Sequence, residues 1–175
     1  MNISIEPLME QPNQVVAVHL LMNQDVLDDP SLKAMLDGAI RLEGSLENMG
    51  NGVVNFDGKL QTKFSVPCDR CTQSAEVLLC IELYEQFRKE WIQDDPSFEQ
   101  ETYTYIQNEI DVSPMINDNI LLHWPAKVLC SEHCKGLCPV CGRNRNTTHC
   151  SCHERKMDEN PFAKLQALLC DDEEV

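Results

Sequence analysis

The chain has 175 residues, of which 42% are hydrophobic, and its 29 acidic and 14 basic side chains give a formal net charge of -15 at pH 7. A chain of this length buries about 70% of the surface exposed by its unfolded form, enough for one core with a small appended module. The negative charge disfavours general binding to nucleic acid and favours a basic protein partner.

The sequence predicts neither a membrane span nor a secretory signal. Its longest apolar run, residues 15–22, is interrupted by His19 and falls short of the roughly 18 apolar residues that a span needs. The first residues lack the basic region and the apolar region of a signal peptide. We therefore expect a cytoplasmic protein without a membrane partner, in a compartment where disulfides are rare and clustered cysteines favour metal binding.

The first half of the chain contains alternating patterns typical of half-buried strands. A strand is expected at 15–21 and a short helical turn at 31–36. Apolar and polar residues then alternate at 39–47, at 52–66 and from Ala75 toward Phe87. Short turns join these segments, so the pattern predicts an antiparallel meander with one solvated face.

Between the third strand and the cysteine-rich stretch, the sequence predicts a loop, a short strand and a helix. After an acidic loop at 93–101 and a short strand at 102–106, a helix is expected at 113–123. Ser113 would be its N-cap and Pro114 would lie in its first turn. We expect three apolar residues of this helix to cover the sheet: Met115, Ile116 and Ile120.

These elements predict an α+β fold, an antiparallel β meander with a few covering helices and a C-terminal zinc-ribbon-like module. The sheet body would span residues 1–126 and include the helix at 113–123. The cysteine-rich module would span 127–156, followed by a C-terminal helix and acidic tail at 157–175. The sequence shows no internal repeat.

Four of the ten cysteines form a pattern typical of a structural zinc site. Cys138-Pro-Val-Cys141-Gly142 is followed by Cys150-Ser-Cys152. A glycine after the second cysteine lets the backbone curl so that amide hydrogens point at the sulfurs, and the second close pair completes four thiolate ligands. We interpret this stretch as a zinc ribbon.

Four further cysteines form two pairs, Cys68 with Cys71 and Cys130 with Cys134. If the two pairs lie together, they can bind a second zinc ion and join the turn between two strands to the entry of the ribbon. Cys80 and Cys170 lie in a predicted strand and a predicted helix, outside both sets.

Other interpretations of these residues remain open. Cys68 and Cys71 can form a redox pair, although such pairs usually begin a helix and both flanks here resemble strands. An iron–sulfur cluster also uses four thiolates. Three histidines can also replace a cysteine as a metal ligand: His133, His149 and His153.

The sequence contains no pattern that supports catalysis, neither a Gly-rich phosphate loop nor a His-Glu-x-x-His motif. A zinc ion with four thiolate ligands has no open position, so we expect neither an enzyme nor a small-molecule substrate. Residues 127–156 carry six basic and two acidic side chains. Lys135, Arg143 and Arg145 are therefore candidate contacts to a partner or to RNA, although their loop can equally be a solvated connector. A DNA-binding ribbon is disfavoured by the net charge.

Several of these motifs together resemble the YceD family, the large ribosomal RNA subunit accumulation proteins. The matching segments span about residues 36–170 and are Cys68-Asp-Arg-Cys71, Ile110-Asp-Val-Ser-Pro, Leu121-Leu-His-Trp-Pro, Cys130 to Cys134, Lys135-Gly-Leu-Cys-Pro-Val-Cys-Gly, Asn144-Arg-Asn146 and Cys150-Ser-Cys152. The chain departs from the family pattern at Arg145, where the family has an apolar residue, and at Asn160-Pro161-Phe162, where it has Asp-Pro-Arg.

The resemblance implies a non-enzymatic factor for accumulation of large-subunit ribosomal RNA, in bacteria or plastids. It also implies a gene association with a small basic zinc-ribbon ribosomal protein. The expected partners are therefore a basic ribosomal protein, ribosomal RNA, or both.

Overall fold

The computed structural model describes residues 1–10, 13–90 and 103–152 in two compact units. Within the described residues, the first unit contains Met1–Val66 and Glu76–Ala126, and the second contains Pro67–Ala75 and residues 127–152. The acidic loop predicted at 93–101, the final helix and the acidic tail within 157–175 lie outside the described residues. None of the helices in the described ranges is long and apolar enough to cross a membrane.

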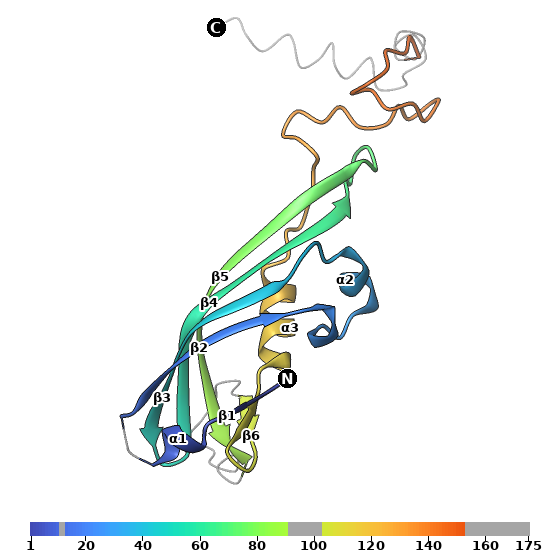
Figure 1. Cartoon of the computed structure of the whole chain (residues 1–175). Helices are drawn as coiled ribbons and strands as arrows, with labels where there is room; N and C mark the ends of the chain where they lie inside the picture. The colour runs from blue at the N-terminus through green and yellow to red at the C-terminus, as the bar shows by residue number, and fades with distance from the viewer. Residues whose placement is uncertain (11–12, 91–102, 153–175) are drawn as a thin grey trace, which may run out of the picture. The chain divides into compact units, whose positions relative to one another are not determined.

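The first unit is built on a five-stranded sheet with the order β2-β3-β4-β5-β6 (Figure 1). Its strands are β2 Val15–Met22, β3 Ile40–Gly50, β4 Val53–Pro67, β5 Ser74–Lys89 and β6 Tyr103–Tyr105. β2 pairs with β3 and β3 pairs with β4 in antiparallel register, while a short turn joins β4 to β5. The strands predicted from alternation are thus confirmed.

β6 departs from the predicted antiparallel meander. It pairs parallel with β5, so that Phe87 lies opposite Tyr103 and Lys89 lies opposite Tyr105. Parallel neighbours require a long connection, and residues 90–102 between the two strands supply it. The sheet is therefore mixed at this edge, and period-two alternation gives no information on the direction of pairing.

A pair of glycines lets β3 and β4 approach closely beneath an aromatic ring. Gly44 and Gly58 are cross-strand partners. A Cβ atom at either position would lie 2.9 or 2.6 Å from the ring tip of Phe56, which is buried. The backbone of the facing strand lies closer still to each added Cβ, so the ring and that backbone together fill the space that two side chains would otherwise take.

The first unit also contains short helices and a second, two-stranded sheet. The helices are α1 Glu6–Met9, η1 Gln24–Val26, α2 Pro30–Met35 and α3 Ser113–Leu122, and the small sheet pairs β1 Asn2–Ser4 with β7 Glu109–Asp111. The predicted turn at 31–36 thus falls in α2, and the predicted helix at 113–123 is α3.

α3 is fixed by its apolar face and by two buried asparagines. Met115, Ile116 and Ile120 are each 0% exposed. Asn117 Nδ2 donates to Val26 O at 2.9 Å, which joins α3 to η1, and Asn119 Nδ2 donates to Glu85 Oε1 at 2.9 Å, which joins α3 to β5. The helix therefore packs against the sheet through residues whose spacing was visible in the sequence.

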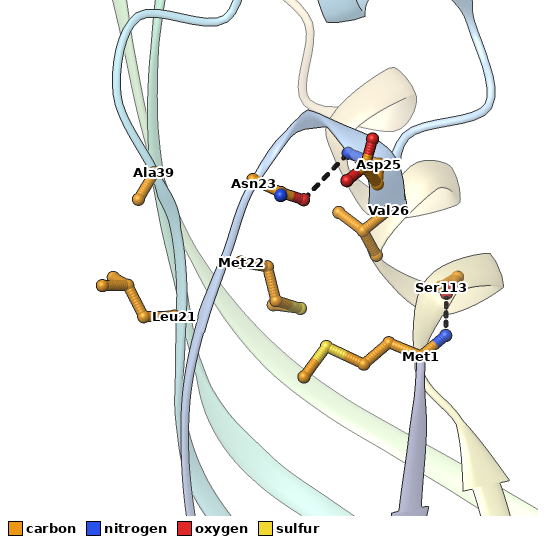
Figure 2. A pocket seen from close by; sticks show the side chains of 8 residues that line it. All are labelled: Met1, Leu21, Met22, Asn23, Asp25, Val26, Ala39 and Ser113. Carbon is orange, nitrogen blue, oxygen red and sulfur yellow. Dashed lines mark hydrogen bonds between the residues drawn. The ribbon is translucent and has the colours of Figure 1, made fainter.

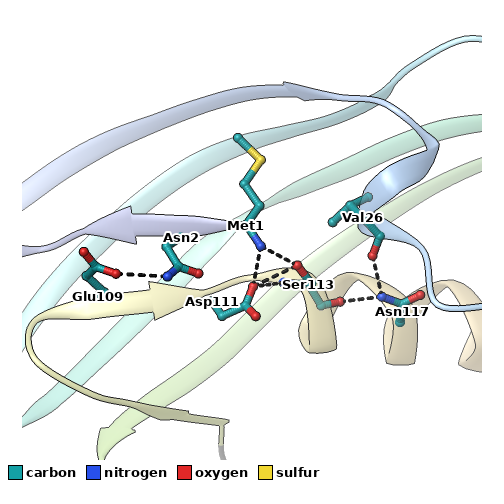
Figure 3. Close-up of polar contacts among 7 residues, drawn as sticks. All are labelled: Met1, Asn2, Val26, Glu109, Asp111, Ser113 and Asn117. Atoms are coloured by element: carbon teal, nitrogen blue, oxygen red, sulfur yellow. Dashed lines mark hydrogen bonds and ion pairs between the residues drawn. The ribbon is translucent and has the colours of Figure 1, made fainter.

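The start of α3 differs from the predicted cap. The helix begins at Ser113 itself, with Val112 in the cap position and no side-chain cap on that residue. Asp111 Oδ1 accepts from the Ser113 amide at 3.0 Å, and the Met1 ammonium lies 2.7 Å from both Asp111 Oδ1 and Ser113 Oγ (Figure 3). The prediction of Ser113 as N-cap was wrong because the aspartate two residues earlier accepts the helix amide.

Candidate metal centre

The structure gathers the eight predicted ligand cysteines into two groups of four. The first group, called group A here, consists of Cys68, Cys71, Cys130 and Cys134, and group B consists of Cys138, Cys141, Cys150 and Cys152. Within each group the Sγ atoms all lie within 4.8 Å of one another. Both groups lie in the second unit.

The sulfur separations in group A suit a tetrahedral ion. Cys68 Sγ lies 3.8 Å from Cys134 Sγ, and Cys71 Sγ lies 3.4 Å from Cys130 Sγ. A tetrahedron with zinc–sulfur bonds of about 2.3 Å has sulfur atoms about 3.8 Å apart, whereas a disulfide bond is only about 2.05 Å long. All described cysteines are free, so each group offers four thiols to one ion.

The two cysteine pairs that begin the groups adopt the same turn. Cys68 N donates to Gln73 O at 2.8 Å and Thr72 N donates to Cys68 O at 2.9 Å. Seventy residues later, Cys138 N donates to Arg143 O at 2.8 Å and Gly142 N donates to Cys138 O at 2.8 Å.

The residue after the second cysteine has positive φ in both turns. The angle is +60° at Thr72 and +70° at Gly142. Glycine adopts this conformation freely, whereas threonine does so at a cost. The glycine after Cys141 predicts this backbone, and the structure shows the same conformation at Thr72, a residue type that does not predict it.

Both turns direct backbone N–H groups at their first sulfur. Burial acts to raise the pKa of Cys68, but backbone N–H groups of Cys130, Arg70 and Cys71 bring that pKa down to about 6. The backbone N–H groups of Cys141 and Val140 hold the pKa of Cys138 at about 6 as well. The first cysteine of each group is thus prepared as a thiolate before any cation is present.

One thiol of each group, Cys130 in group A and Cys152 in group B, is held in the protonated form by the neighbouring sulfurs. The adjacent Cys71 raises the pKa of Cys130 to about 12, and the adjacent Cys141 raises the pKa of Cys152 to about 11. Four thiolates at this spacing repel one another, and a divalent cation at their centre removes that repulsion. The electrostatics of both groups therefore favour a bound cation.

Group A is supported by a network that the sequence analysis missed. Asn146 Nδ2 donates to Cys134 Sγ at 3.3 Å, and Asn146 Oδ1 accepts from Lys135 N at 2.7 Å. The Arg70 side chain donates through Nη1 to Cys134 O at 2.9 Å. The Arg70 backbone carbonyl accepts a hydrogen bond from Leu137 N at 2.9 Å. These contacts join the turn at Cys68 to the stretch around Cys134.

Gly136 is required by this close approach. Its φ is +71°, and a Cβ atom there would lie 3.0 Å from the carbonyl oxygen of Arg70. The signal available in the sequence was the Asn-x-Asn loop and the glycine after Lys135, but neither pattern alone indicates a contact to a sulfur.

The two groups differ in burial. In group A, Cys68, Cys71 and Cys134 are buried, whereas Cys141 in group B is exposed. A metal ion in group A would be enclosed by protein, and one in group B would lie at the surface. Group B ligands come from a single stretch of chain, whereas those of group A come from two distant stretches.

The remaining sequence candidates lie outside the two groups. His133 and His149 are exposed and belong to neither group, and His153 lies outside the described residues. Cys80 lies exposed on β5, where Gln61 donates to its sulfur, and Cys170 lies outside the described residues. The three basic candidates are all exposed: Lys135, Arg143 and Arg145.

Taken together, the fold and the site define a small mixed α+β protein whose second unit carries two four-thiol groups suited to metal ions. The family model of the large ribosomal RNA subunit accumulation protein YceD matches residues 56–169, which include all eight clustered cysteines. The chain therefore belongs to the YceD family.

Two curated plant proteins are similar to parts of the chain. The large ribosomal RNA subunit accumulation protein YCED homolog 1, chloroplastic, of Zea mays is 46% identical over 50 residues, which cover 28% of this chain and 17% of that protein. The protein of the same name from Arabidopsis thaliana is 33% identical over 63 residues, which cover 35% of this chain and 20% of that protein. The chain thus matches about a fifth of the length of these relatives or less. No solved structure matches the chain.

Proposed function

We propose that this protein is a non-enzymatic, zinc-stabilised factor needed for accumulation of the large-subunit ribosomal RNA. The observation that carries the proposal is the family match over residues 56–169, because it includes both cysteine groups. The curated relatives bear names that state the same role.

Zinc is the ion that suits both groups best. Four sulfur ligands in a tetrahedral arrangement are typical of zinc or iron–sulfur sites. Paired turns with backbone N–H groups directed at the sulfurs are typical of structural zinc. Since four thiolates leave no open position, the ions would stabilise the second unit and provide no site for a substrate.

The charge distribution supports a role in binding. The described residues of the first unit carry 16 acidic and six basic side chains, whereas those of the second unit carry two acidic and five basic. The first unit therefore suits a basic ribosomal protein, and the exposed side chains of Lys135, Arg143 and Arg145 suit contact with ribosomal RNA. Each zinc ion bound to four thiolates adds a charge of about -2 relative to four neutral thiols. Two such sites add about -4, so the second unit becomes nearly neutral when both are loaded.

A redox function of Cys68 and Cys71 is the second candidate, because the pKa of Cys68 is lowered to about 6. Cys68 and Cys71 nevertheless each contact the sulfur of another pair, Cys68 that of Cys134 at 3.8 Å and Cys71 that of Cys130 at 3.4 Å. A protein with reversible disulfides and no metal would support this candidate.

The experiment depletes the protein in its own organism and measures the ratio of large-subunit to small-subunit ribosomal RNA. We expect the ratio to fall and to be restored by the wild-type chain but not by Cys71→Ser or Cys141→Ser. A matched control is Cys80→Ser, which changes a cysteine outside both groups and should restore the ratio fully. An unchanged ratio after depletion would contradict the proposal.

We expect the protein to act in the compartment where the corresponding ribosomes are assembled. The sequence predicts the cytoplasm, whereas both curated plant relatives are named as chloroplastic. In either case the proposed partners are components of the large ribosomal subunit, and no membrane or small-molecule substrate is involved.

A further inference from the structure

β2 forms one edge of the five-stranded sheet, and its composition leaves this edge open to pairing. The strand has the sequence Val-Val-Ala-Val-His-Leu-Leu-Met and contains no proline, lysine or acidic residue. Proteins usually protect edge strands with such residues, with bulges, or by making them very short. The strand at the other edge, β6, has only three residues, so β2 is the unprotected edge.

The register with β3 shows which backbone groups face outward. Asn48 N donates to Gln14 O at 3.1 Å, so Gln14 and Asn48 form a hydrogen-bonded pair. Two residues further along β2, Val16 lies opposite Leu46 and forms the next pair of this kind. Since hydrogen-bonded pairs alternate along an antiparallel ladder, the residues between them direct N–H and C=O groups away from β3. The residues with outward-facing backbone groups are Val15, Ala17, His19 and Leu21. Among the described residues, no hydrogen bond to their outward groups is recorded.

An open hollow of about 610 Å³ lies beside the end of β2. Figure 2 shows Met1, Leu21, Met22 and Val26 among the residues that line this space. Leu21 is 68% exposed. An added strand places alternate side chains on the two faces of a sheet, so every second side chain of a partner could enter the hollow.

The surroundings of this edge are acidic. Glu47 lies opposite Val15 and Glu43 lies opposite His19 on the neighbouring strand β3, and Asp25 lines the hollow. One basic residue, Arg41 opposite Leu21, lies 3.9 Å from Glu43, so the acidic side chains along β2 remain in excess. Pairing of two β2 edges from two copies would bring together two units that each carry ten more acidic than basic described side chains. Repulsion disfavours that dimer, and the same field attracts a basic chain.

We infer that the outer edge of β2 binds an extended basic segment of a partner protein as an added strand, with apolar side chains directed into the hollow beside Met22. This mode of recognition uses main-chain hydrogen bonds for affinity and alternate side chains for specificity. The basic character of the partner rests on the proposed function, whereas the open edge rests on the geometry of β2 alone.

The test uses the purified full chain and a short peptide that alternates Lys and Val. We expect binding that weakens about tenfold or more in Ala17→Pro, because proline removes an outward N–H group and no hydrogen bond to β3. Ala17→Ser is the matched control and should bind as the wild type does. The same peptide N-methylated at alternate residues should also lose binding to the unaltered chain, so the test does not depend on the folding of the proline variant.

Amide hydrogen exchange locates the contact. We expect the peptide to increase protection at Val15, Ala17, His19 and Leu21, with little change at Val16 and Val18. Equal binding by the N-methylated peptide, protection gained elsewhere, or outward amides already protected in the free monomer would overturn the inference. A dimer dissociated by Ala17→Pro would also overturn it, since a second copy would then be the occupant. This readout involves no ribosomal RNA, so its failure leaves the depletion experiment as a separate test.

Discussion

Cys71 and Cys130 are 59 residues apart in the sequence, and their Sγ atoms lie 3.4 Å apart. Group A therefore closes a long loop of chain, whereas group B takes all its ligands from residues 138–152. A cross-link that closes a longer loop removes more entropy from the unfolded chain. A metal ion in group A should therefore contribute more to the organisation of the second unit than one in group B.

The two groups should bind metal independently. Cys71→Ser is expected to lower the zinc content by one ion per chain, and Cys141→Ser should lower it by one ion as well, because the ligand sets share no residue. Elemental analysis of the purified variants measures both effects. Loss of both ions from Cys141→Ser alone would show that group A depends on group B, contrary to the geometry.

Asn146 should adjust the metal affinity of group A alone. Its amide donates to Cys134 Sγ at 3.3 Å, and loss of a contact that orients a ligand typically lowers metal affinity about 10–100-fold. Asn146→Ala should thus release one zinc ion to a competing chelator at a lower chelator concentration. His149→Ala is the control, since His149 is exposed and outside both groups, and it should release both ions as the wild type does.

Metal binding should be linked to proton release. Because neighbouring thiols raise the pKa of Cys130 to about 12 and that of Cys152 to about 11, these thiols are protonated in the metal-free chain at neutral pH. They must lose their protons to bind zinc, so the affinity should fall as the pH falls. Calorimetric titrations of zinc in buffers of different ionisation enthalpy measure the protons released. A heat of binding independent of the buffer would contradict the assignment of these cysteines as ligands.

The glycine pair in the first unit should be sensitive to a single methyl group. In Gly58→Ala the new Cβ would lie 2.6 Å from the ring tip of Phe56 and against the backbone of β3, and such overpacking costs about 1–3 kcal/mol of the free energy of unfolding. Denaturant unfolding monitored by the sheet signal measures the loss.

The control for this substitution is Gly50→Ala. Gly50 has φ +80° with no atom within 4 Å of the new Cβ, so only the left-handed backbone penalty of about 1 kcal/mol applies. The zinc content should be unchanged in both variants, because the two glycines lie outside the second unit. Equal losses of stability in the two variants would contradict the role of the Phe56 ring.

The sequence predicted most of the large sheet because one physical pattern determines it. The alternation of Val54, Phe56 and Leu60 with polar residues places one face in the core, and the structure buries all three. The pairing of β6 and the short strands β1 and β7 were not predictable in this way. Segments of three residues carry too little periodicity, and the direction of pairing depends on the connection between the strands.

The candidate site was predicted in its composition but not in its supporting contacts. The spacing of Cys138, Cys141, Cys150 and Cys152 follows from the geometry of one metal ion, so the sequence was informative. The amide of Asn146 donates to the sulfur of Cys134 and the guanidinium of Arg70 donates to the carbonyl of Cys134, and the spacing of the residues indicates neither contact. The turn shared by Cys68 and Cys138 was not predictable from the sequence. Only the two cysteines recur in both segments, and Thr72 stands where the second segment has Gly142.

We propose that this member of the YceD family holds two zinc ions in two independent groups of four thiolates. Native mass spectrometry of the full chain tests it most directly, because it reports the mass of bound metal and the loss of hydrogen from cysteines in one measurement. We predict a mass increase corresponding to two zinc ions, which acid or a strong chelator removes to leave the mass of the fully reduced chain. A metal-free chain whose mass is lowered by the hydrogens of one or more disulfides would contradict the account.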